Sequence, residues 1–275
     1  MKTRFVLCAL LAVAFWSCDT IPEDEYLLID DSTPTYQGTG HRILLEEFTG
    51  VKCNNCPAAS LEAKRLQSIF GKENVIIIGI HAGNLATTDE KHPKAFNTPE
   101  GTELFNFFQL FGVPVGFVNR LDYDEGTIIK AEGDWRNIIP SELERLPVAE
   151  INLIEDSYNA GTRELTVNGL IEVLDTADGI PANTNIAIYL TENNIISPQT
   201  MGDKSVNENY EHNHVLRGSF TGTYGESVDL SGGSANFSES ISLPQDAVKE
   251  NCEVVAFIYN SDNYEILQVN ALKLN

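Results

Sequence analysis

Basic residues are scarce in this chain of 275 residues. It has 18 lysines and arginines against 40 aspartates and glutamates, which gives a formal net charge of −22. An excess of negative charge repels nucleic acid and the headgroups of anionic lipids. We therefore expect no nucleic acid among the partners of this protein, and any attachment to a membrane has to come from a covalent lipid instead of a basic patch.

The apolar run at the N-terminus is too short for a transmembrane helix, which needs about 20 residues. Lys2 and Arg4 precede the apolar residues 5–16, and Ser17 and Cys18 end the segment. This order is typical of a signal peptide, which we assign to residues 1–17. A cysteine after a small residue is similar to a bacterial lipobox, so we predict that Cys18 is lipidated after cleavage. An ordinary secretory signal is the alternative.

Cysteines are few as well, and an exported protein accounts for the position of each one. Of the five, Cys8 leaves with the signal peptide and Cys18 is the predicted lipid site. In an oxidising compartment Cys53 and Cys56 can form a disulfide, which leaves Cys252 unpaired. Cys252 opens an apolar run, so we interpret it as a buried core residue without a role. No second cysteine pair is present to complete a zinc site at Cys53 and Cys56.

The composition and the pattern of apolar residues divide the chain into four parts, of which the signal peptide is the first. Residues 18–40 are acidic, contain Pro and Gly and lack periodicity, which predicts a tether; an edge strand at Tyr26–Ile29 is the alternative. Residues 41–147 alternate between strand and helix patterns, which predicts an α/β domain. Its expected elements are strands at 43–48, 75–80 and 112–118 and helices at 59–70, 98–111 and 135–146.

Residues 148–275 change to recurring short strands without helices between them. Short strands that follow one another in this way predict an all-β antiparallel sandwich domain. The expected strands are Val148–Ile154, Glu164–Leu174, Asn185–Thr191, Val215–Tyr224, Ala235–Leu243, Cys252–Tyr259 and Ile266–Leu274.

The sequence CNNCP at residues 53–57 lies between a predicted strand and a predicted helix. Thioredoxin-like proteins use two thiols in this arrangement for dithiol chemistry. A helix N-terminus lowers the pKa of a thiol, which is about 8.5 when free. We predict that Cys53 is the more exposed nucleophile and that Cys56, one turn into the helix, resolves the mixed disulfide. The alternative is a purely structural disulfide.

Two further residues are candidates for this site. Strand alternation can point Glu47 inward beneath the thiols, where a buried carboxyl can exchange a proton with Cys56. Otherwise Glu46 or Glu47 simply faces solvent at the strand end. Pro114 precedes an apolar strand, the position at which thioredoxin-like folds place a cis-proline facing the dithiol.

The histidines offer a second group of polar side chains. If residues 212–214 are extended, His212 and His214 share one face and could bind a metal with Glu208 or Glu211. Polar residues before a strand more often form a turn, so we predict neither a metal nor a cofactor. His81 ends a strand and is interpreted as structural.

Several of these segments together resemble a known family, the twenty-eight-kilodalton outer-membrane proteins. The resemblance rests on the lipobox-like start, LEEFTG at 45–50, CNNCP at 53–57, GVP at 112–114 and HNHVLR at 212–217. The family implies a Gram-negative lipoprotein with a thioredoxin-like domain before a β-rich domain. From thioredoxins, the resemblance implies that Cys53 and Cys56 are the redox pair, Glu47 the buried acid and Pro114 the cis-proline. Lys52 replaces their usual Trp, so their substrate-docking surface is not carried over.

The sequence therefore predicts a lipid-anchored protein of the cell envelope, at the outer membrane, attached to it through Cys18. We expect thiol–disulfide exchange at Cys53 and Cys56 with a protein partner. The alternative is a surface lipoprotein without enzymatic activity, a binding or scaffold module in which the same disulfide is structural.

Overall fold

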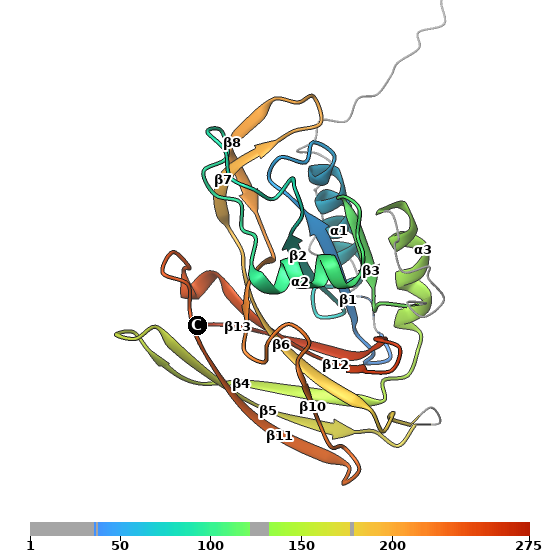
Figure 1. Ribbon diagram of the computed structural model, residues 1–275. Coiled ribbons are helices and arrows are strands. Elements are labelled where there is room, and N and C mark those ends of the chain that lie inside the picture. The colour runs from blue at the N-terminus through green and yellow to red at the C-terminus, as the bar shows by residue number, and fades with distance from the viewer. Residues whose placement is uncertain (1–35, 37, 122–131, 177–178) are drawn as a thin grey trace, which may run out of the picture. The chain divides into compact units, whose positions relative to one another are not determined.

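The computed structural model describes residues 36, 38–121, 132–176 and 179–275, and these residues form a β-rich fold with several sheets (Figure 1). The predicted signal peptide, Cys18 and most of the predicted tether lie outside the described residues. In the described part, no helix is long and apolar enough to cross a membrane. The β-rich character predicted from the sequence is confirmed.

The N-terminal half of the fold begins with a strand, a helix and a parallel strand. Strands β1 and β2 run side by side because helix α1 carries the chain back between them. Strand β3 then pairs with β1 in the antiparallel direction. The elements are β1 (Ile43–Thr49), α1 (Cys56–Phe70), β2 (Val75–His81), α2 (Pro99–Phe107), β3 (Val115–Val118) and α3 (Glu132–Leu143).

Helix α2 is shorter than predicted. It begins where the Thr98 hydroxyl accepts a hydrogen bond from the Gly101 N–H, at 3.0 Å. It ends before Gln109, whose φ of 52° lies in the left-handed region and cannot continue a right-handed helix. Of the two phenylalanines after it, which suggested a longer helix, Phe108 belongs to the aromatic core and Phe111 is exposed.

The C-terminal half is built from strands. All seven strands predicted there are present, with end points shifted by a few residues, and β7, β8 and β10 were not predicted. The strands are β4 (Ala149–Asn159), β5 (Glu164–Val173), β6 (Thr184–Glu192), β7 (Ile195–Thr200), β8 (Val206–His212), β9 (Val215–Ser219), β10 (Glu226–Ser227), β11 (Ser234–Ser242), β12 (Cys252–Asn260) and β13 (Ile266–Lys273).

One sheet contains strands from both halves. Within the described residues its order is β13-β12-β6-β9-β2-β1-β3, and β10 adds to β6 as an eighth strand. The two halves join where β9 pairs with β2 in parallel. At this point the Gly79 N–H donates to the His214 carbonyl oxygen at 2.7 Å. The sheet therefore runs through the boundary that the sequence placed at residue 147.

The two faces of this sheet are covered differently. On one face, an aromatic core that includes Phe48, Tyr189 and Phe257 packs against α2. On the other face, α1 and α3 cover β1 and β2, where Leu45 packs near Trp135. The three-stranded sheet β11-β5-β4 covers β6 and β12 on that second face (Figure 1). Burial of these apolar layers stabilises the fold at about 25 cal/mol per Å².

Glu46 forms an ion pair inside the aromatic core. Its two carboxylate oxygens accept from Nε and Nη2 of Arg120 at 2.7 and 2.6 Å. The rings of Phe108, Phe257 and Tyr259 surround the guanidinium, with centroids 5.3 to 5.5 Å from its carbon. Neither Glu46 nor Glu47 faces solvent, so the interpretation that placed one of them at an exposed strand end is wrong.

Candidate functional site

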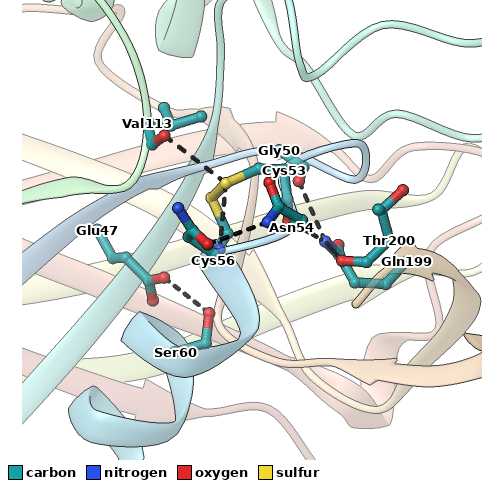
Figure 2. The surroundings of a disulfide bond; sticks show 10 residues. Glu47, Gly50, Cys53, Asn54, Cys56, Ser60, Val113, Gln199 and Thr200 are labelled. Carbon is teal, nitrogen blue, oxygen red and sulfur yellow. Dashed lines mark hydrogen bonds between the residues drawn. A yellow bond between two sulfur atoms is a disulfide. The ribbon is translucent and has the colours of Figure 1, made fainter. Parts of the chain in front are cut away.

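Cys53 and Cys56 form a disulfide in the turn between β1 and α1, as predicted (Figure 2). Cys252, the other cysteine in the described residues, is free and fully buried. Burial raises the pKa of the Cys252 thiol to about 12, and the nearby Glu192 carboxylate adds to the shift. Because Cys252 is fully buried in the apolar core, the prediction that it is a core residue is confirmed.

Helix α1 begins at the disulfide itself. Cys56 is the first helical residue and not one turn into the helix as predicted. Asn55 occupies the N-cap position, but its side chain makes no capping hydrogen bond to the helix backbone. The Cys56 N–H instead points to Cys53 Sγ at 3.1 Å. After reduction, a Cys53 thiolate would accept this N–H and lie at the positive end of the helix dipole. Both effects stabilise a thiolate.

The disulfide is covered on several sides. Cys53 exposes 2% of its surface and Cys56 exposes 1%, so both residues are buried and the predicted difference in exposure between them is slight. The Val113 carbonyl oxygen lies 3.7 Å from Cys53 Sγ. The Lys52 N–H donates to the Leu85 carbonyl at 3.0 Å, which fixes the loop of residues 82–98 beside the turn. A reacting partner needs one of these covering segments to move.

Gln199 on strand β7 holds the disulfide turn from the other side. Its Nε2 lies 2.9 Å from the Cys53 carbonyl oxygen and 3.3 Å from that of Gly50 (Figure 2). The neighbouring Thr200 N–H donates to the Val51 carbonyl at 2.9 Å. Sequence reasoning missed Gln199 because it lies in no motif; the signal present was the alternation of Ser197 and Gln199 on one side of a short strand.

Glu47 lies under the start of α1, as its position in β1 predicted. Its side chain is almost fully buried, and the Ser60 hydroxyl donates to Glu47 Oε1 at 2.7 Å. Ser60 stands one helical turn after Cys56. Tyr210 from β8 approaches the same carboxylate, and burial together with the charge of Glu47 raises the pKa of Tyr210 to about 12. The role of Glu47 in proton transfer stays a prediction.

The peptide bond between Val113 and Pro114 is cis, as predicted. The contact between the Val113 carbonyl and Cys53 Sγ shows that this bond faces the disulfide, because Val113 is the residue directly before the proline. Four of the predicted site residues, Cys53, Cys56, Glu47 and Pro114, therefore lie around one turn of the chain.

The histidines do not form the arrangement that a metal site requires. Strand β8 ends at His212, and His214 has a φ of 57°, so the segment is not extended and the shared face is not formed. The His212 ring packs against Phe96 and Tyr210, and its Nε2 lies 3.3 Å from the Ser197 carbonyl oxygen. In the parts of the chain that the structure describes, no three His, Cys, Asp or Glu side chains are grouped to hold a metal ion.

His81 and His212 are both buried, with ring centroids 5.6 Å apart. Burial lowers the pKa of His212 to about 4. Burial and the proximity of His212 and Arg217 lower the pKa of His81 to about 3. This pair lies beside the base of β8 and agrees with a structural role for His81.

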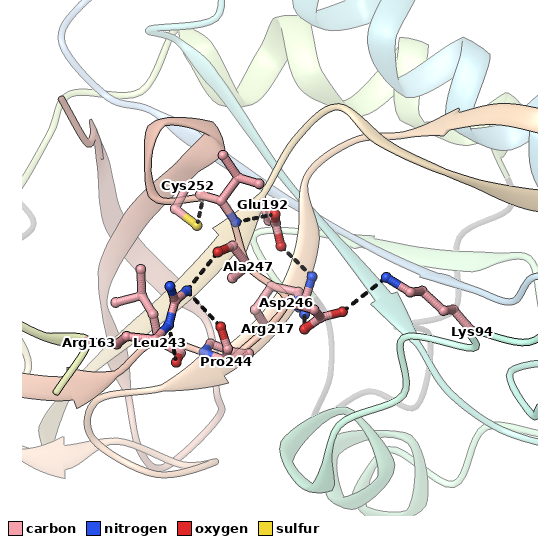
Figure 3. Close-up of polar contacts among 10 residues, drawn as sticks. Lys94, Arg163, Glu192, Arg217, Leu243, Pro244, Asp246, Ala247 and Cys252 are labelled. Atoms are coloured by element: carbon pink, nitrogen blue, oxygen red, sulfur yellow. Dashed lines mark hydrogen bonds and ion pairs between the residues drawn. The ribbon is translucent and has the colours of Figure 1, made fainter. Parts of the chain in front are cut away.

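A second polar cluster lies away from the disulfide (Figure 3). Arg217 pairs with Glu192 and Asp246, and Lys94 Nζ is 3.3 Å from Asp246 Oδ2. A cavity of about 580 Å³ adjoins Lys94, Arg217 and Asp246. Glu192 also accepts the Val248 N–H at 2.8 Å. The charges satisfy one another, so we assign this cluster to the fold.

Comparisons with known proteins give one match to a protein family. The family model described as "Outer membrane protein Omp28" matches residues 102–275. No curated protein matches the chain.

Two solved structures from Porphyromonas gingivalis are similar to this chain. The first, HBP35, is 20% identical, with a TM-score of 0.68 over 88% of this chain and 77% of that one. At this identity the match shows the fold alone. The second is a domain of the outer membrane lipoprotein Omp28, 21% identical, with a TM-score of 0.34 over 46% of this chain and 96% of that one.

Proposed function

The chain belongs to the Omp28 family of outer membrane proteins and is a protein of the cell envelope, and we propose that it exchanges thiols and disulfides with a protein partner through Cys53 and Cys56. Residues 41–147 would act as a thioredoxin-like domain, and residues 148–275 would bind or position the partner. The observation that carries this proposal is the Cys56 N–H directed at Cys53 Sγ at the start of α1, opposite the cis peptide of Pro114.

The exchange begins with the reduced protein. The Cys53 thiolate attacks one sulfur of the partner's disulfide, and the other partner sulfur leaves as a thiolate, which takes up a proton. The Cys56 thiol then loses its proton and attacks Cys53 Sγ. This step forms the Cys53–Cys56 disulfide and releases the second partner thiol. The partner gains two electrons and this protein loses two. With a reduced dithiol partner and the oxidised form of this protein, the same steps run in reverse, and the Cys53–Cys56 disulfide gains the two electrons.

Glu47 is the candidate acceptor of the Cys56 proton. It is buried under the first turn of α1 and held there by the Ser60 hydroxyl. A buried carboxylate beside a resolving thiol can take up the proton and return it in the reverse reaction. Ser60 would orient the carboxylate and not react itself.

Membrane attachment belongs to the same proposal. Family membership supports a lipid on Cys18, with the acidic residues after it as a tether between the membrane and the folded part. The net charge of −22 offers no basic surface for anionic lipids, so a lipid chain would supply the anchor.

Reduction of insulin disulfides by the full chain, with dithiothreitol as the electron source, tests the proposal. We expect catalysis by the wild type, none by Cys53→Ser, and a trapped mixed disulfide with Cys56→Ser. Cys252→Ser is the matched control and should remain active, because Cys252 is buried and lies outside the site. Equal rates for wild type and Cys53→Ser would overturn the exchange activity.

The low exposure of both sulfurs favours a second candidate function. In a binding or scaffold lipoprotein the disulfide would only fasten the start of α1. Loss of the bond in Cys56→Ala would then lower stability by about 2 kcal/mol, the chain-entropy value for so short a loop. This reading predicts the same loss of stability in Cys53→Ser and no insulin reduction by any form of the protein.

A further inference from the structure

The hairpin formed by β7 and β8 is separate from the other sheets. Among the described strands, these two pair only with each other. Its inner side is polar and buried, with Ser197, Gln199 and His212 each less than 6% exposed. The apolar Ile196 on its outer side is 57% exposed. A strand that is held by apolar burial has its apolar side chains on the inner side and its polar side chains on the outer side, and this hairpin has the opposite arrangement.

The tip of the hairpin lies on the disulfide turn. Gln199 reaches the carbonyls of Cys53 and Gly50, as described above. In the turn between the strands, an added Cβ on Gly202 would lie 3.8 Å from the Asn54 carbonyl oxygen. The hairpin thus covers the turn with main-chain and amide contacts.

A second contact joins the hairpin to the loop of residues 82–98. The Thr200 hydroxyl lies 3.0 Å from His92 Nε2, and His92 Nδ1 lies 2.9 Å from Asp89 Oδ1. Lys52 Nζ is 4.0 Å from Asp89 Oδ2, so the same network returns to the residue before Cys53. The two segments that contact the disulfide turn are therefore joined to each other by polar groups.

These contacts can be exchanged for water at low cost. A hydrogen bond within a protein contributes about 0.5–1.5 kcal/mol net, because water replaces it when it opens. The base of the hairpin is held more firmly, through the Gly79 N–H bond to the His214 carbonyl and the packing of His212 on Phe96. The tip can therefore swing away while the base stays in place.

We propose that the β7–β8 hairpin is a gate that closes the Cys53–Cys56 disulfide and must swing aside before a partner reaches Cys53. This inference rests on the proposed function and adds its regulation. Gln199 is the main latch, because its amide holds the carbonyl of Cys53 itself. A partner polypeptide that offers its own donor to this carbonyl would take the place of Gln199.

The rate of disulfide reduction in the oxidised full chain tests the gate. The probe is tris(2-carboxyethyl)phosphine, which becomes the phosphine oxide with oxygen from water while the disulfide becomes two thiols. Iodoacetamide then labels the thiols, and peptide masses report Cys53, Cys56 and Cys252 separately. We expect Gln199→Ala to raise the reduction rate about tenfold, the effect of losing ~1.4 kcal/mol of closing energy.

Two further variants make the result specific. Thr200→Val removes the hydroxyl contact with His92 and should raise the rate by a smaller factor. Asn209→Ala, at an exposed position of β8, is the matched control and should react like wild type. Cys252 is fully buried and reports global unfolding, so its labelling should not change. An unchanged reduction rate in Gln199→Ala, or an equal rise in Cys252 labelling, overturns the gate.

The test separates the gate from the exchange activity. The phosphine reduces any disulfide that it can reach, whether or not that disulfide serves a partner. A faster reaction in Gln199→Ala together with no insulin reduction would keep the gate and remove the exchange activity. Insulin reduction by the wild type, with no effect of Gln199→Ala on the phosphine reaction, would keep the exchange activity and remove the gate.

Discussion

Glu46 and Glu47 are neighbours in β1, and their carboxylates lie on opposite faces of the same sheet. Glu46 points into the aromatic core and pairs with Arg120, whereas Glu47 points under α1 and binds Ser60. Because successive strand residues alternate between faces, two adjacent acids receive different environments. One holds the fold together and the other lies at the candidate site.

The Glu46–Arg120 pair should be costly to break from one side. Arg120→Met leaves the Glu46 carboxylate buried without a partner, and we expect the free energy of unfolding to fall by about 3–5 kcal/mol. Urea unfolding of wild type and variant measures this difference. Arg136→Met, which removes an exposed partner of Glu62, is the control and should change stability by less than about 1 kcal/mol. Equal losses in the two variants would contradict a special role for the buried pair.

Glu47→Gln should slow exchange more than it lowers stability. The amide keeps an acceptor for the Ser60 hydroxyl but takes up no proton, so we expect the insulin reduction rate to fall by about 10²-fold. Ser60→Ala, which removes the orienting hydroxyl and keeps the carboxylate, should reduce the rate less. The two rates and the two melting temperatures are compared with wild type. A Glu47→Gln variant with the wild-type rate would show that Cys56 loses its proton elsewhere.

Stability should fall as the pH drops below about 6.5, the pKa of histidine in an unfolded chain. His81 and His212 have folded pKa values of about 3 and about 4 because they are buried. Between these values and pH 6.5 the unfolded chain binds protons that the folded chain does not. As the pH falls through this window, each histidine therefore lowers the free energy of unfolding by up to ~1.4 kcal/mol per pH unit.

His212→Phe tests this dependence, because phenylalanine keeps a ring against Phe96 and Tyr210 and does not titrate. It also removes a source of repulsion for a charged His81. Urea unfolding at pH 6.5, 5.5 and 4.5 should give a shallower loss of stability in the variant. The same slope in both proteins would mean that other groups carry the effect.

Gly50→Ala should separate the disulfide turn from the loop of residues 82–98. An added Cβ would lie 2.7 Å from the Leu85 carbonyl carbon and oxygen, which are backbone atoms and cannot move as a side chain does. We expect a loss of about 1–3 kcal/mol, as for other overpacked sites, and faster reduction of the disulfide. Gly112→Ala is the control, since nothing lies within 4 Å of its added Cβ. Thermal melts and the phosphine assay compare the two; a fully stable Gly50→Ala variant would contradict the close approach.

Local patterns in the sequence were enough to predict the strands and helices with apolar periodicity. The run of residues 75–80 predicted β2, and the position of CNNCP predicted a disulfide at the start of α1. Glu47 and Pro114 were placed correctly near the disulfide because strand alternation and an X-Pro before a strand are local signals. The redox role of these residues remains a prediction.

Features that depend on distant residues were not predicted. β8 reads VNENYEH and has no apolar alternation, and β7 contains Pro198, which argues against a strand. The hairpin that they form contacts the disulfide turn through Gln199, and the low exposure of both cysteines was not predicted. The joining of β2 to β9 rests on the single pair Gly79 and Val215, which leaves no pattern in either segment.

The reduction potential of the Cys53–Cys56 disulfide is the most direct test of the exchange activity. The full chain is equilibrated with buffers of oxidised and reduced dithiothreitol, its thiols are alkylated, and the reduced fraction is read from peptide masses. Our account predicts a reversible two-electron transition above about −300 mV, in the range of disulfides that exchange with partners. A potential below about −300 mV, typical of structural disulfides, would contradict it.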